Sequence, residues 1–557
     1  MARVDNPILF MTTSPRTPAK MVPEIELLIK NFQGQHWNKE SQIKFMEVLR
    51  DEQFFNGEGK NDPSFSARDR INRAPQSLGF VILKPTIELT PAGESLVYSK
   101  RKGEVFLRQL LKFQVPSPYH KPSDVAADFW VKPYLELLRL VRHFGTLKFD
   151  ELQIFGMQLT NWHKFDEIVE KIENFRKEKL ENKGNYKTFK RQVLDRELKE
   201  IFAQRIAEGK TKTRESADDS LAKFLETQSH NMRDYADACF RYLRATELVN
   251  VSQVGKSLSI VPERIEDVDY ILKHVNRDPV YVDDKQSYIA YLGDKATPKL
   301  LTDSIGKLRA KIHKEFPQQP VSVTWDIIKL KDLLADLMEE RKQKTLDKQV
   351  ADIKDYKLYD DIQETFEQIE KNKLYDAPLM LEWNTWRAMT MLDGGSIKAN
   401  LNFDDFGKPL STAAGNMPDI VCDYGDFYVS VEVTMSSGQK QYEMEGEPVS
   451  RHLGKLKGAT GKPCYCLFVA PTINDACIAH FFGLSQMNIS YYGGKSIIVP
   501  LSLEVFRKMV EDSYKASNTP SPANVRKFFE YSQQLSSSGC SEKQWFERME
   551  QRAANWV

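Results

Sequence analysis

The first part of the chain alternates short amphipathic helices with a small β-hairpin. Apolar residues recur at helical spacing over Pro23–Lys30 and Ser41–Asp51. A third helix is expected over Phe65–Arg73, where Ser66 and Asp69 indicate a capping-box-like start. Two β-rich runs around a Lys84-Pro85 turn and one further helix follow, at Gly79–Leu83, Ile87–Thr90 and Ala92–Tyr98. Helices followed by a hairpin predict a winged-helix-like module within residues 1–150.

The same order of helices and hairpin returns from Pro133 onwards. We assign the second module to residues 151–270. Helical patterns at Pro133–His143, Phe149–Phe155 and Asp234–Arg244 precede two short apolar runs. These runs, Leu248–Val251 and Leu258–Val261, flank a Gly-Lys turn and predict a second hairpin. A charged helical insertion around 164–226 separates the first helices of this module from the last. We therefore expect two winged-helix-like modules in tandem.

The remaining pattern divides at about residue 372. Residues 271–372 are mostly helical and charge-dense, which predicts a helical linker domain. From 373 to 557 a Trp-rich helix, short apolar strands, glycine turns and a helical tail indicate an independent α/β domain. The expected fold class is multidomain and α-rich α+β.

Length and composition agree with several soluble domains. The chain has 557 residues, 41% of them hydrophobic and 28% charged, with a net charge of +1. No run approaches the roughly 20 apolar residues of a membrane helix, and the start lacks the long apolar stretch of a secretory signal. Six cysteines are too few for a disulfide scaffold, and none completes a zinc tetrad. A reduced bacterial cytoplasm is the expected location.

The most basic stretch lies in the helical insertion. Arg176–Arg214 holds thirteen basic and six acidic residues. Lys187, Lys190 and Arg191 are candidates for contacts with DNA phosphates, which position a protein without specifying sequence. The alternative is a solvated helix face, which is the more common reason for a charge run.

Two acidic residues suggest chemistry in the last domain. Asp419 precedes a β-branched run, and Glu432 lies thirteen residues later on the strand Phe427–Thr434. Two strands of a hairpin with that separation can bring both carboxylates to one edge. Mg²⁺ binds one or two carboxylates and keeps its waters. The pattern indicates a metal-dependent phosphodiesterase, although a turn Asp and a solvated strand Glu would give the same spacing.

Further acids and one histidine could join that pair. Glu382 lies near the start of the Trp-rich helix. Glu443, Glu445 and Glu447 precede His452, and any one of these acids could complete the metal shell. His452 could accept a proton or position a water.

These segments resemble the AlwI/MlyI/BstNBI group of Type IIS restriction endonucleases and site-specific nicking enzymes. The resemblance covers nearly the whole chain and is carried by Ala413-Ala-Gly-Asn-Met-Pro-Asp419, Val431-Glu-Val-Thr434, Met444–His452, Glu382–Trp386, Leu467–Pro471, Ile498–Ser502, Thr13–Pro18, Phe65–Arg70 and Gly79–Val81. It implies an N-terminal part that reads an asymmetric site of the GAGTC or GGATC kind. It also implies a C-terminal PD-(D/E)XK domain that cuts a few nucleotides downstream with Mg²⁺.

The resemblance assigns roles to the candidate residues. It implies that Asp419 and Glu432 are metal ligands, Glu382 and Glu445 are further acids of the site, and His452 is a catalytic auxiliary. The lysine of the broader superfamily pattern is replaced here by Thr434. Charge stabilisation must then come from the metal, from His452, or from another lysine such as Lys455 or Lys457.

Base reading is expected from the helix that begins near Ser66. Arg70 and Arg73 are i,i+3 neighbours and should share a face. Arginine can bond guanine O6 and N7 bidentately, and Asn72 suits adenine. Arg68 is a third arginine candidate, but it could contact phosphate, and Asp69 could simply pair with Arg73.

One nuclease centre cuts one strand, so several assemblies fit a protein of this kind. The expected protein is a monomer on double-stranded DNA that cuts both strands by transient dimerisation of cleavage domains or with a small second subunit. It could also act as a strand-specific nicking enzyme or as the large subunit of a heterodimeric enzyme. A cognate DNA methyltransferase is the expected companion. The alternative from another class is a winged-helix DNA-binding regulator with a non-catalytic nuclease-like domain.

Overall fold

The computed structural model describes residues 2–52, 62–213, 216–392, 395–412, 415, 417–516 and 519–557. Ala413, Ala414 and Asn416 of the first resemblance motif lie outside the described residues. The chain forms two compact units, one made of Met1–Arg50 and Gly57–Leu337 and the other of Asp51–Asn56 and Met338–Val557. We call them unit 1 and unit 2 and describe each by itself.

Unit 1 begins with the helices and hairpin that the sequence predicts. The elements are α1 (Met21–Phe32), α2 (Lys39–Asp51), α3 (Pro63–Ile71), α4 (Ala74–Ser77), β2 (Val81–Ile82), β3 (Glu88–Leu89), α5 (Pro91–Tyr98) and α6 (Lys102–Lys112). Strands β2 and β3 pair antiparallel, which confirms the predicted hairpin. The predicted start of α3 is wrong: Asp62 caps the helix by accepting from the Phe65 N–H, and Pro63 occupies the first turn.

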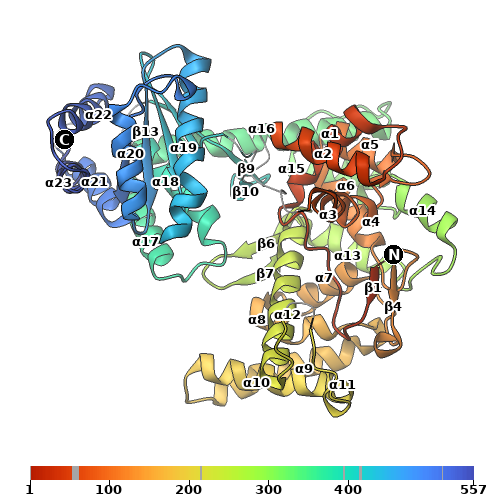
Figure 1. Ribbon diagram of the computed structural model, residues 1–557. Helices are drawn as coiled ribbons and strands as arrows, with labels where there is room; N and C mark the ends of the chain where they lie inside the picture. Colours follow the sequence, from red (N-terminus) through yellow and green to blue (C-terminus); the bar gives the residue numbers. More distant parts are fainter. Residues whose placement is uncertain are drawn as a thin grey trace. The chain divides into compact units, whose positions relative to one another are not determined.

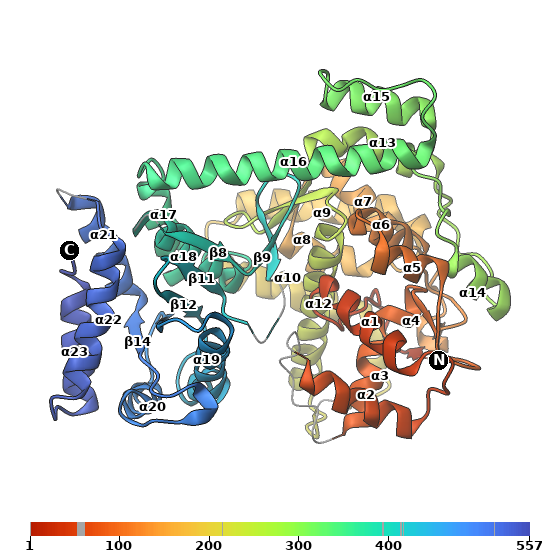
Figure 2. The same cartoon turned by 90° about the horizontal axis from the view of Figure 1, so that it is seen from above.

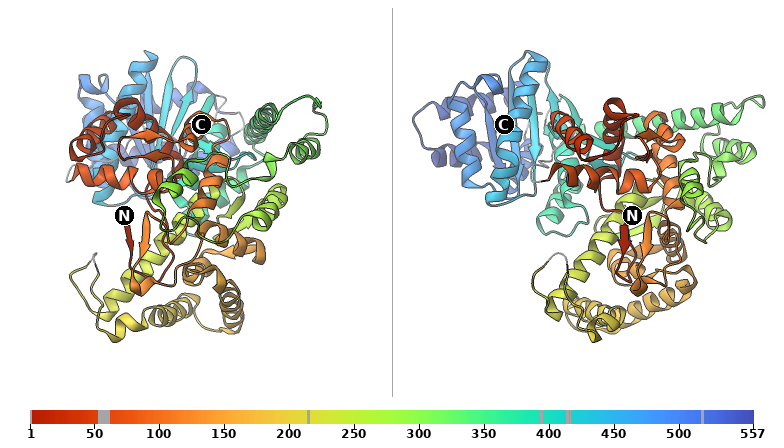
Figure 3. Two further views of the ribbon diagram at one scale, coloured as in Figure 1. Left: turned by 90° about the vertical axis from the view of Figure 1, so that its right-hand side faces the viewer. Right: turned by 45° about the vertical axis from the view of Figure 1, so that its right-hand side comes forward.

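The second set of unit 1 elements surrounds a three-stranded sheet of order β5-β7-β6. Its elements are α7 (Pro133–Phe144), β5 (Thr146–Lys148), α8 (Phe149–Ile154), α9 (Phe165–Glu181), α10 (Tyr186–Ile201), α11 (Ala203–Ala207), α12 (Leu221–Arg244), β6 (Val249–Ser252) and β7 (Ser257–Ile260). The predicted hairpin and insertion are confirmed as β6–β7 and α9–α11. Helices α9–α11 gather at one end of this unit (Figures 1 and 3). Helix α12 is longer than predicted.

The N-terminal strand β1 (Ala2–Val4) pairs parallel with β4 (His120–Pro122). The end of unit 1 is helical as predicted, with α13 (Ile265–His274), α14 (Lys285–Gly293) and α15 (Ile305–Glu315). Helix α16 (Ile327–Lys354) continues past residue 337, so the boundary between the units falls within one helix. This boundary lies inside the segment 271–372 that the sequence suggests as a linker.

Unit 2 is built on one five-stranded mixed sheet of order β14-β13-β12-β11-β8. The strands are β8 (Ser396–Ala399), β11 (Ile420–Asp423), β12 (Tyr428–Val433), β13 (Cys464–Ala470) and β14 (Ile498–Ser502). Strands β8, β11 and β12 pair antiparallel, whereas β12, β13 and β14 pair parallel. Parallel pairs need a crossover, and α19 (Gln439–Thr460) and α20 (Asp475–Gln486) provide the two crossovers.

Helices cover both faces of this sheet. Figure 2 shows α17 (Tyr359–Glu370), α18 (Ala377–Leu392) and α21 (Leu503–Lys515) on one face, and α19 with α20 on the other. The elements α22 (Pro522–Ser536) and α23 (Glu542–Ala553) pack beside β14, and a hairpin of β9 (Leu401–Phe403) and β10 (Pro409–Thr412) is inserted before β11. Because both faces are covered, β12, β13 and β14 are almost wholly buried, whereas the edge strand β8 is partly exposed.

The described residues contain no helix with both the length and the apolar character that a bilayer crossing requires. All six cysteines are free thiols. The model confirms a helix-rich α+β protein.

Candidate functional site

Asp419 and Glu432 meet where β11 begins and β12 ends. Ile420 is the cross-strand partner of Val431, so the preceding Asp419 lies opposite Glu432. Oδ2 of Asp419 accepts a hydrogen bond from the Val433 N–H at 2.8 Å. Glu432 is buried, with only 5% of its surface exposed. The register of the hairpin therefore brings the two carboxyl groups together.

Helix α19 brings His452 and Glu445 to the same place. Nδ1 of His452 lies 2.8 Å from Oε1 of Glu432. Glu445 precedes His452 by seven residues, which is two helical turns, so both side chains lie on one face of α19. Burial raises the pKa of Glu445, and a hydrogen bond from the side chain of Thr434, which directly follows β12, offsets part of that rise. We call Asp419, Glu432, Glu445 and His452 the acid cluster.

The carboxyl groups of the acid cluster resist ionisation. Burial raises the pKa of Asp419 well above its usual value, and the nearby charges of Glu432 and Glu445 raise it further. Burial also raises the pKa of Glu432, and the negative charge of Glu445 raises it further. Burial raises the pKa of Glu445. Like charges in a buried place favour either protons or a cation. Within the described residues, no three His, Cys, Asp or Glu side chains are already arranged to hold a metal ion.

His452 is neutral over the physiological range. Burial lowers its pKa to about 4, and the positive charges of Arg451 and Lys455 contribute. When Glu432 is ionised, Nδ1 donates to it and the lone pair stays on Nε2. Nε2 is buried, and no described residue is its hydrogen-bond partner. With Glu432 ionised, the imidazole therefore presents Nε2 as its acceptor.

The two lysines considered in place of Thr434 differ in their surroundings. Nζ of Lys457 donates to the carbonyls of Tyr492 at 3.2 Å and Lys495 at 2.7 Å, which ties it to a neighbouring loop. Lys455 is exposed and follows His452 by three residues on α19, so its charge is felt at the imidazole. Lys457 is therefore held by backbone carbonyls, whereas the Lys455 side chain is exposed.

The remaining acidic candidates lie differently. Glu443 is exposed, and Glu447 pairs with Arg451 at 3.0 Å, so Glu445 is the member of this trio that reaches the cluster. Glu382 is half-buried on α18, which packs on β11 and β12 from the other face of the sheet.

Two of the expected DNA-contacting residues have partners inside the protein. Arg70 pairs with Glu24, which is 2% exposed, so its guanidinium neutralises a buried carboxylate. The expectation that Arg70 shares a face with Arg73 is wrong because α3 ends at Ile71. The side-chain oxygen of Asn72 accepts from Trp37 Nε1 at 2.9 Å, and its nitrogen donates to Gln76 at 3.2 Å.

The other two arginines of this segment are exposed. Arg73 pairs with Asp69, the alternative that the sequence left open, and donates to Oγ1 of Thr13 at 3.3 Å. Nε of Arg68 donates to the Ser64 carbonyl at 3.3 Å. No described residue accepts from the two terminal nitrogens of Arg68.

The basic candidates of α10 separate in the same way. Lys190 pairs with Asp150 at 2.5 Å, whereas Lys187 is exposed. Arg191 has 84% of its side chain exposed, with Asp195 3.9 Å away. Lys187 and Arg191 remain accessible to a phosphate, and Lys190 has a structural partner.

Sequence reasoning missed several groups that the fold places near these sites. Cys466 lies beside Ser430 in the β12–β13 register, and burial raises the pKa of its thiol, with a further contribution from the charge of Glu432. Polar residues of α12, including Gln228 and Asn231, line a groove together with α3. In the sequence, these α12 residues form a polar stripe at three- and four-residue spacing just before the predicted hairpin, and this stripe could have identified them.

Comparison with known proteins identifies the class of enzyme to which this chain belongs. Residues 76–509 match the family model described as AlwI restriction endonuclease, so the protein is a restriction enzyme, a hydrolase that cleaves DNA. The chain belongs to the AlwI restriction endonuclease family.

A solved structure is also similar to part of the chain. It is the small subunit (R.BspD6I2) of the heterodimeric restriction endonuclease R.BspD6I, at 25% sequence identity. The similarity covers 35% of this chain and 98% of that chain, with a TM-score of 0.30. No curated protein matches the chain by sequence.

Proposed function

We propose that this restriction endonuclease is a Type IIS enzyme that recognises a short asymmetric duplex site, of the GAGTC or GGATC kind, with unit 1. Unit 2, a PD-(D/E)XK nuclease domain in this proposal, hydrolyses the phosphodiester bond a few nucleotides away. The two helix-and-hairpin sets of unit 1 act as winged-helix modules. The observation that carries the cleavage part is the meeting of Asp419, Glu432, Glu445 and His452 from β11, β12 and α19.

The donor set of the acid cluster fits Mg²⁺. Asp419 and Glu432 supply two carboxylates, which is the number that Mg²⁺ takes from a protein while it keeps waters. Their raised pKa values reflect burial first and then the like charges brought together, and a divalent cation would relieve both. The ion would supply a Lewis acid for the phosphoryl oxygen and lower the pKa of water. Glu445 would orient the water shell, with Glu382 as a further acid.

His452 and Lys455 have distinct proposed roles. Nε2 of His452 accepts a proton from the attacking water, because Glu432 holds the opposite nitrogen and burial keeps the ring neutral. Lys455 faces solvent one turn further along α19 and stabilises the negative phosphate. In this arrangement Thr434 has no catalytic contact and serves to orient Glu445.

One chain cuts one strand in this proposal, because the described residues hold a single cluster of this composition. Double-strand cleavage then uses a second copy of the cleavage domain or a smaller subunit. A strand-specific nicking enzyme or the large subunit of a heterodimer would use the same site. A companion methyltransferase would protect the host's own copies of the recognition site.

A DNA-binding regulator with an inactive nuclease-like domain is disfavoured. Membership of a restriction endonuclease family and the complete set of four clustered side chains both speak for an active enzyme. Burying three carboxyl groups close together costs folding free energy, and in an inactive domain no function would offset that cost.

Cleavage of plasmid DNA tests the proposal. Supercoiled plasmid is incubated with wild-type protein in Mg²⁺, in EDTA, and with Asp419→Asn in Mg²⁺. We expect open-circular or linear products only from the wild type with Mg²⁺, and run-off sequencing of both strands then gives the site and offset. Cleavage in EDTA, or by Asp419→Asn at the wild-type rate, would contradict the proposal.

A further inference from the structure

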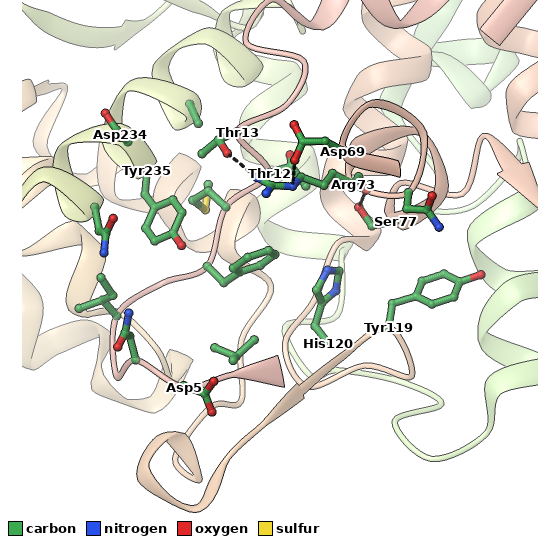
Figure 4. A pocket seen from close by; sticks show the side chains of 18 of the residues that line it. Asp5, Thr12, Thr13, Asp69, Arg73, Ser77, Tyr119, His120, Asp234 and Tyr235 are labelled. Carbon is green, nitrogen blue, oxygen red and sulfur yellow. Dashed lines mark hydrogen bonds and ion pairs between the residues drawn. The ribbon is translucent and has the colours of Figure 1, made fainter. Parts of the chain in front are cut away.

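A groove of about 1250 Å³ lies within unit 1, and its lining includes no residue of the acid cluster. Its lining comes from four stretches: residues 4–16, residues 65–77, the β4 region and residues 205–238. Figure 4 shows Tyr235 on one side of the groove and Arg73 on the other, with Thr12 between them. The volume exceeds the roughly 300–1,000 Å³ of small-molecule pockets, which indicates a segment of a macromolecule as the occupant.

One wall is formed by α3 and α4. Phe65, Arg68 and Asn72 line the groove along α3 and its C-terminal cap, at spacings of three and four residues, and Gln76 lines it from the separate helix α4. Arg70 is absent from this face because it turns towards Glu24. The wall therefore presents Arg68 and Gln76, while Asn72 is held by Trp37 and by Gln76 itself.

The opposite wall is one stripe of α12. Gln228, Asn231, Tyr235 and Ala238 line the groove at spacings of three, four and three residues. The Asn231 amide is half-buried and lies 3.5 Å from the Gln228 side chain. Both walls share one position in the fold, because α3–α4 precedes the hairpin β2–β3 and α12 precedes β6–β7.

Ion pairs and hydrogen bonds hold the two walls to the floor. Arg73 donates to Thr13 and pairs with Asp69, which fixes the α3–α4 wall. On the other side, Arg16 of the N-terminal segment pairs with Asp237 of α12 at 3.4 Å. The groove is therefore preformed by contacts between segments that are far apart in sequence.

The side chains of the groove suit base edges better than phosphates. Its lining includes five amides, at Asn6, Asn72, Gln76, Gln228 and Asn231. Five basic side chains are matched by four aspartates, so the excess of positive charge is small. Phosphates would be repelled by the aspartates, whereas base edges offer both donors and acceptors to amides and guanidinium groups.

We infer that this groove reads base edges of the DNA recognition site, with Arg68 contacting a guanine and Asn231 contacting an adenine. The inference rests on the proposed role of unit 1 in recognition and extends it to a second wall, α12. Arg70, which the sequence offered as a reader, has a structural role. In the helix-turn-helix class one helix lies in the major groove and contacts base edges, and we assign that action to the two walls.

Selection from a random duplex library tests this inference without any cleavage. Wild-type protein binds the library in EDTA, and the retained DNA is sequenced. The wild type should select one asymmetric motif. Arg68→Ala should lose selectivity at one guanine, and Asn231→Ala at one adenine, each by roughly tenfold or more. Gln286→Ala, an exposed amide on another unit 1 helix, serves as the matched control and should leave the motif unchanged.

Conservative variants protect the test against misfolding. Arg68→Lys keeps the charge but loses the bidentate fork, so it should lose guanine selectivity as Arg68→Ala does. Asn231→Asp should shift the preference at its position from adenine towards cytosine, because a carboxylate accepts from the cytosine amino group. Variants that keep the wild-type motif, or that weaken binding to all DNA equally, would overturn the inference. A chain that selects a motif but never cleaves it in Mg²⁺ would instead overturn the proposed function and leave the groove standing.

Discussion

The acid cluster of unit 2 and the groove of unit 1 both contain several charged side chains. They differ in whether the carboxylates are paired with basic groups. In the groove, Asp69 and Asp237 are each paired with an arginine. In the acid cluster, Asp419, Glu432 and Glu445 are close to one another, and burial raises the pKa of all three. Paired charges cost the fold little, whereas clustered like charges persist where function needs them. In the proposed function, the paired charges belong to the groove that recognises DNA, and the clustered carboxyl groups belong to the site that cleaves it.

The strongest test of this difference is to remove one carboxylate charge from the acid cluster. Glu432→Gln should reduce cleavage to below about one per cent of the wild type, because a neutral amide is a poor ligand for a divalent cation. Binding to a cognate duplex in EDTA should be unchanged, and fluorescence anisotropy would measure it. Loss of specific binding together with cleavage would contradict the division of labour between the units.

His452→Ala should have the next largest effect, a loss of roughly 10²–10³-fold in single-turnover cleavage. The ring lies against Glu432 and has a free acceptor at Nε2. Its role is tested further by the pH profile, because the wild-type ring is neutral above a pKa of about 4 and should remain a competent acceptor down to that region. A variant that keeps the wild-type rate would show that the histidine only packs against Glu432.

Arg70→Ala sharpens the other side of the comparison. It should destabilise unit 1 by about 2 kcal/mol, because Glu24 stays buried without its partner, while partial exposure of Arg70 limits the loss. Thermal unfolding would measure the change, and adding Glu24→Gln should recover part of it. The base selectivity of the folded variant should match the wild type. A changed motif would return Arg70 to the reading surface.

The smallest expected effect is a pH dependence of stability in unit 2. A carboxyl whose pKa is raised in the folded protein binds a proton that the unfolded chain releases near pH 4, so stability in EDTA falls as pH rises above that value. Asp419→Asn removes one such group and should raise the unfolding temperature at pH 8 by about 2–4 °C. Mg²⁺ should stabilise the wild type more than this variant. An unfolding temperature that is independent of pH would contradict the clustering of like charges.

Local pattern predicted much of the fold. The helical spacing of Pro23–Lys30 and the alternation of Phe427–Thr434 depend on neighbours in sequence, and both appear as α1 and β12. The separation of Asp419 and Glu432 was enough to anticipate that one hairpin would join them. Such features are set by backbone periodicity and by short connections.

Tertiary partners were beyond the reach of the sequence. Arg70 was expected to read DNA, but its partner Glu24 lies 46 residues earlier in the chain. The sequence pattern does not single out Asn231, because the groove that it lines joins α12 to α3 across about 160 residues. The start of α3 was misplaced because Asp62 competes with Ser66 as a cap and Pro63 favours the earlier start.

A crystal structure with Ca²⁺, which replaces Mg²⁺ without promoting cleavage in this account, tests the acid cluster most directly. We predict one anomalous peak with a carboxylate oxygen of Asp419 and one of Glu432 each within about 2.3–2.6 Å. A saturated crystal with no cation between these two residues would contradict the account.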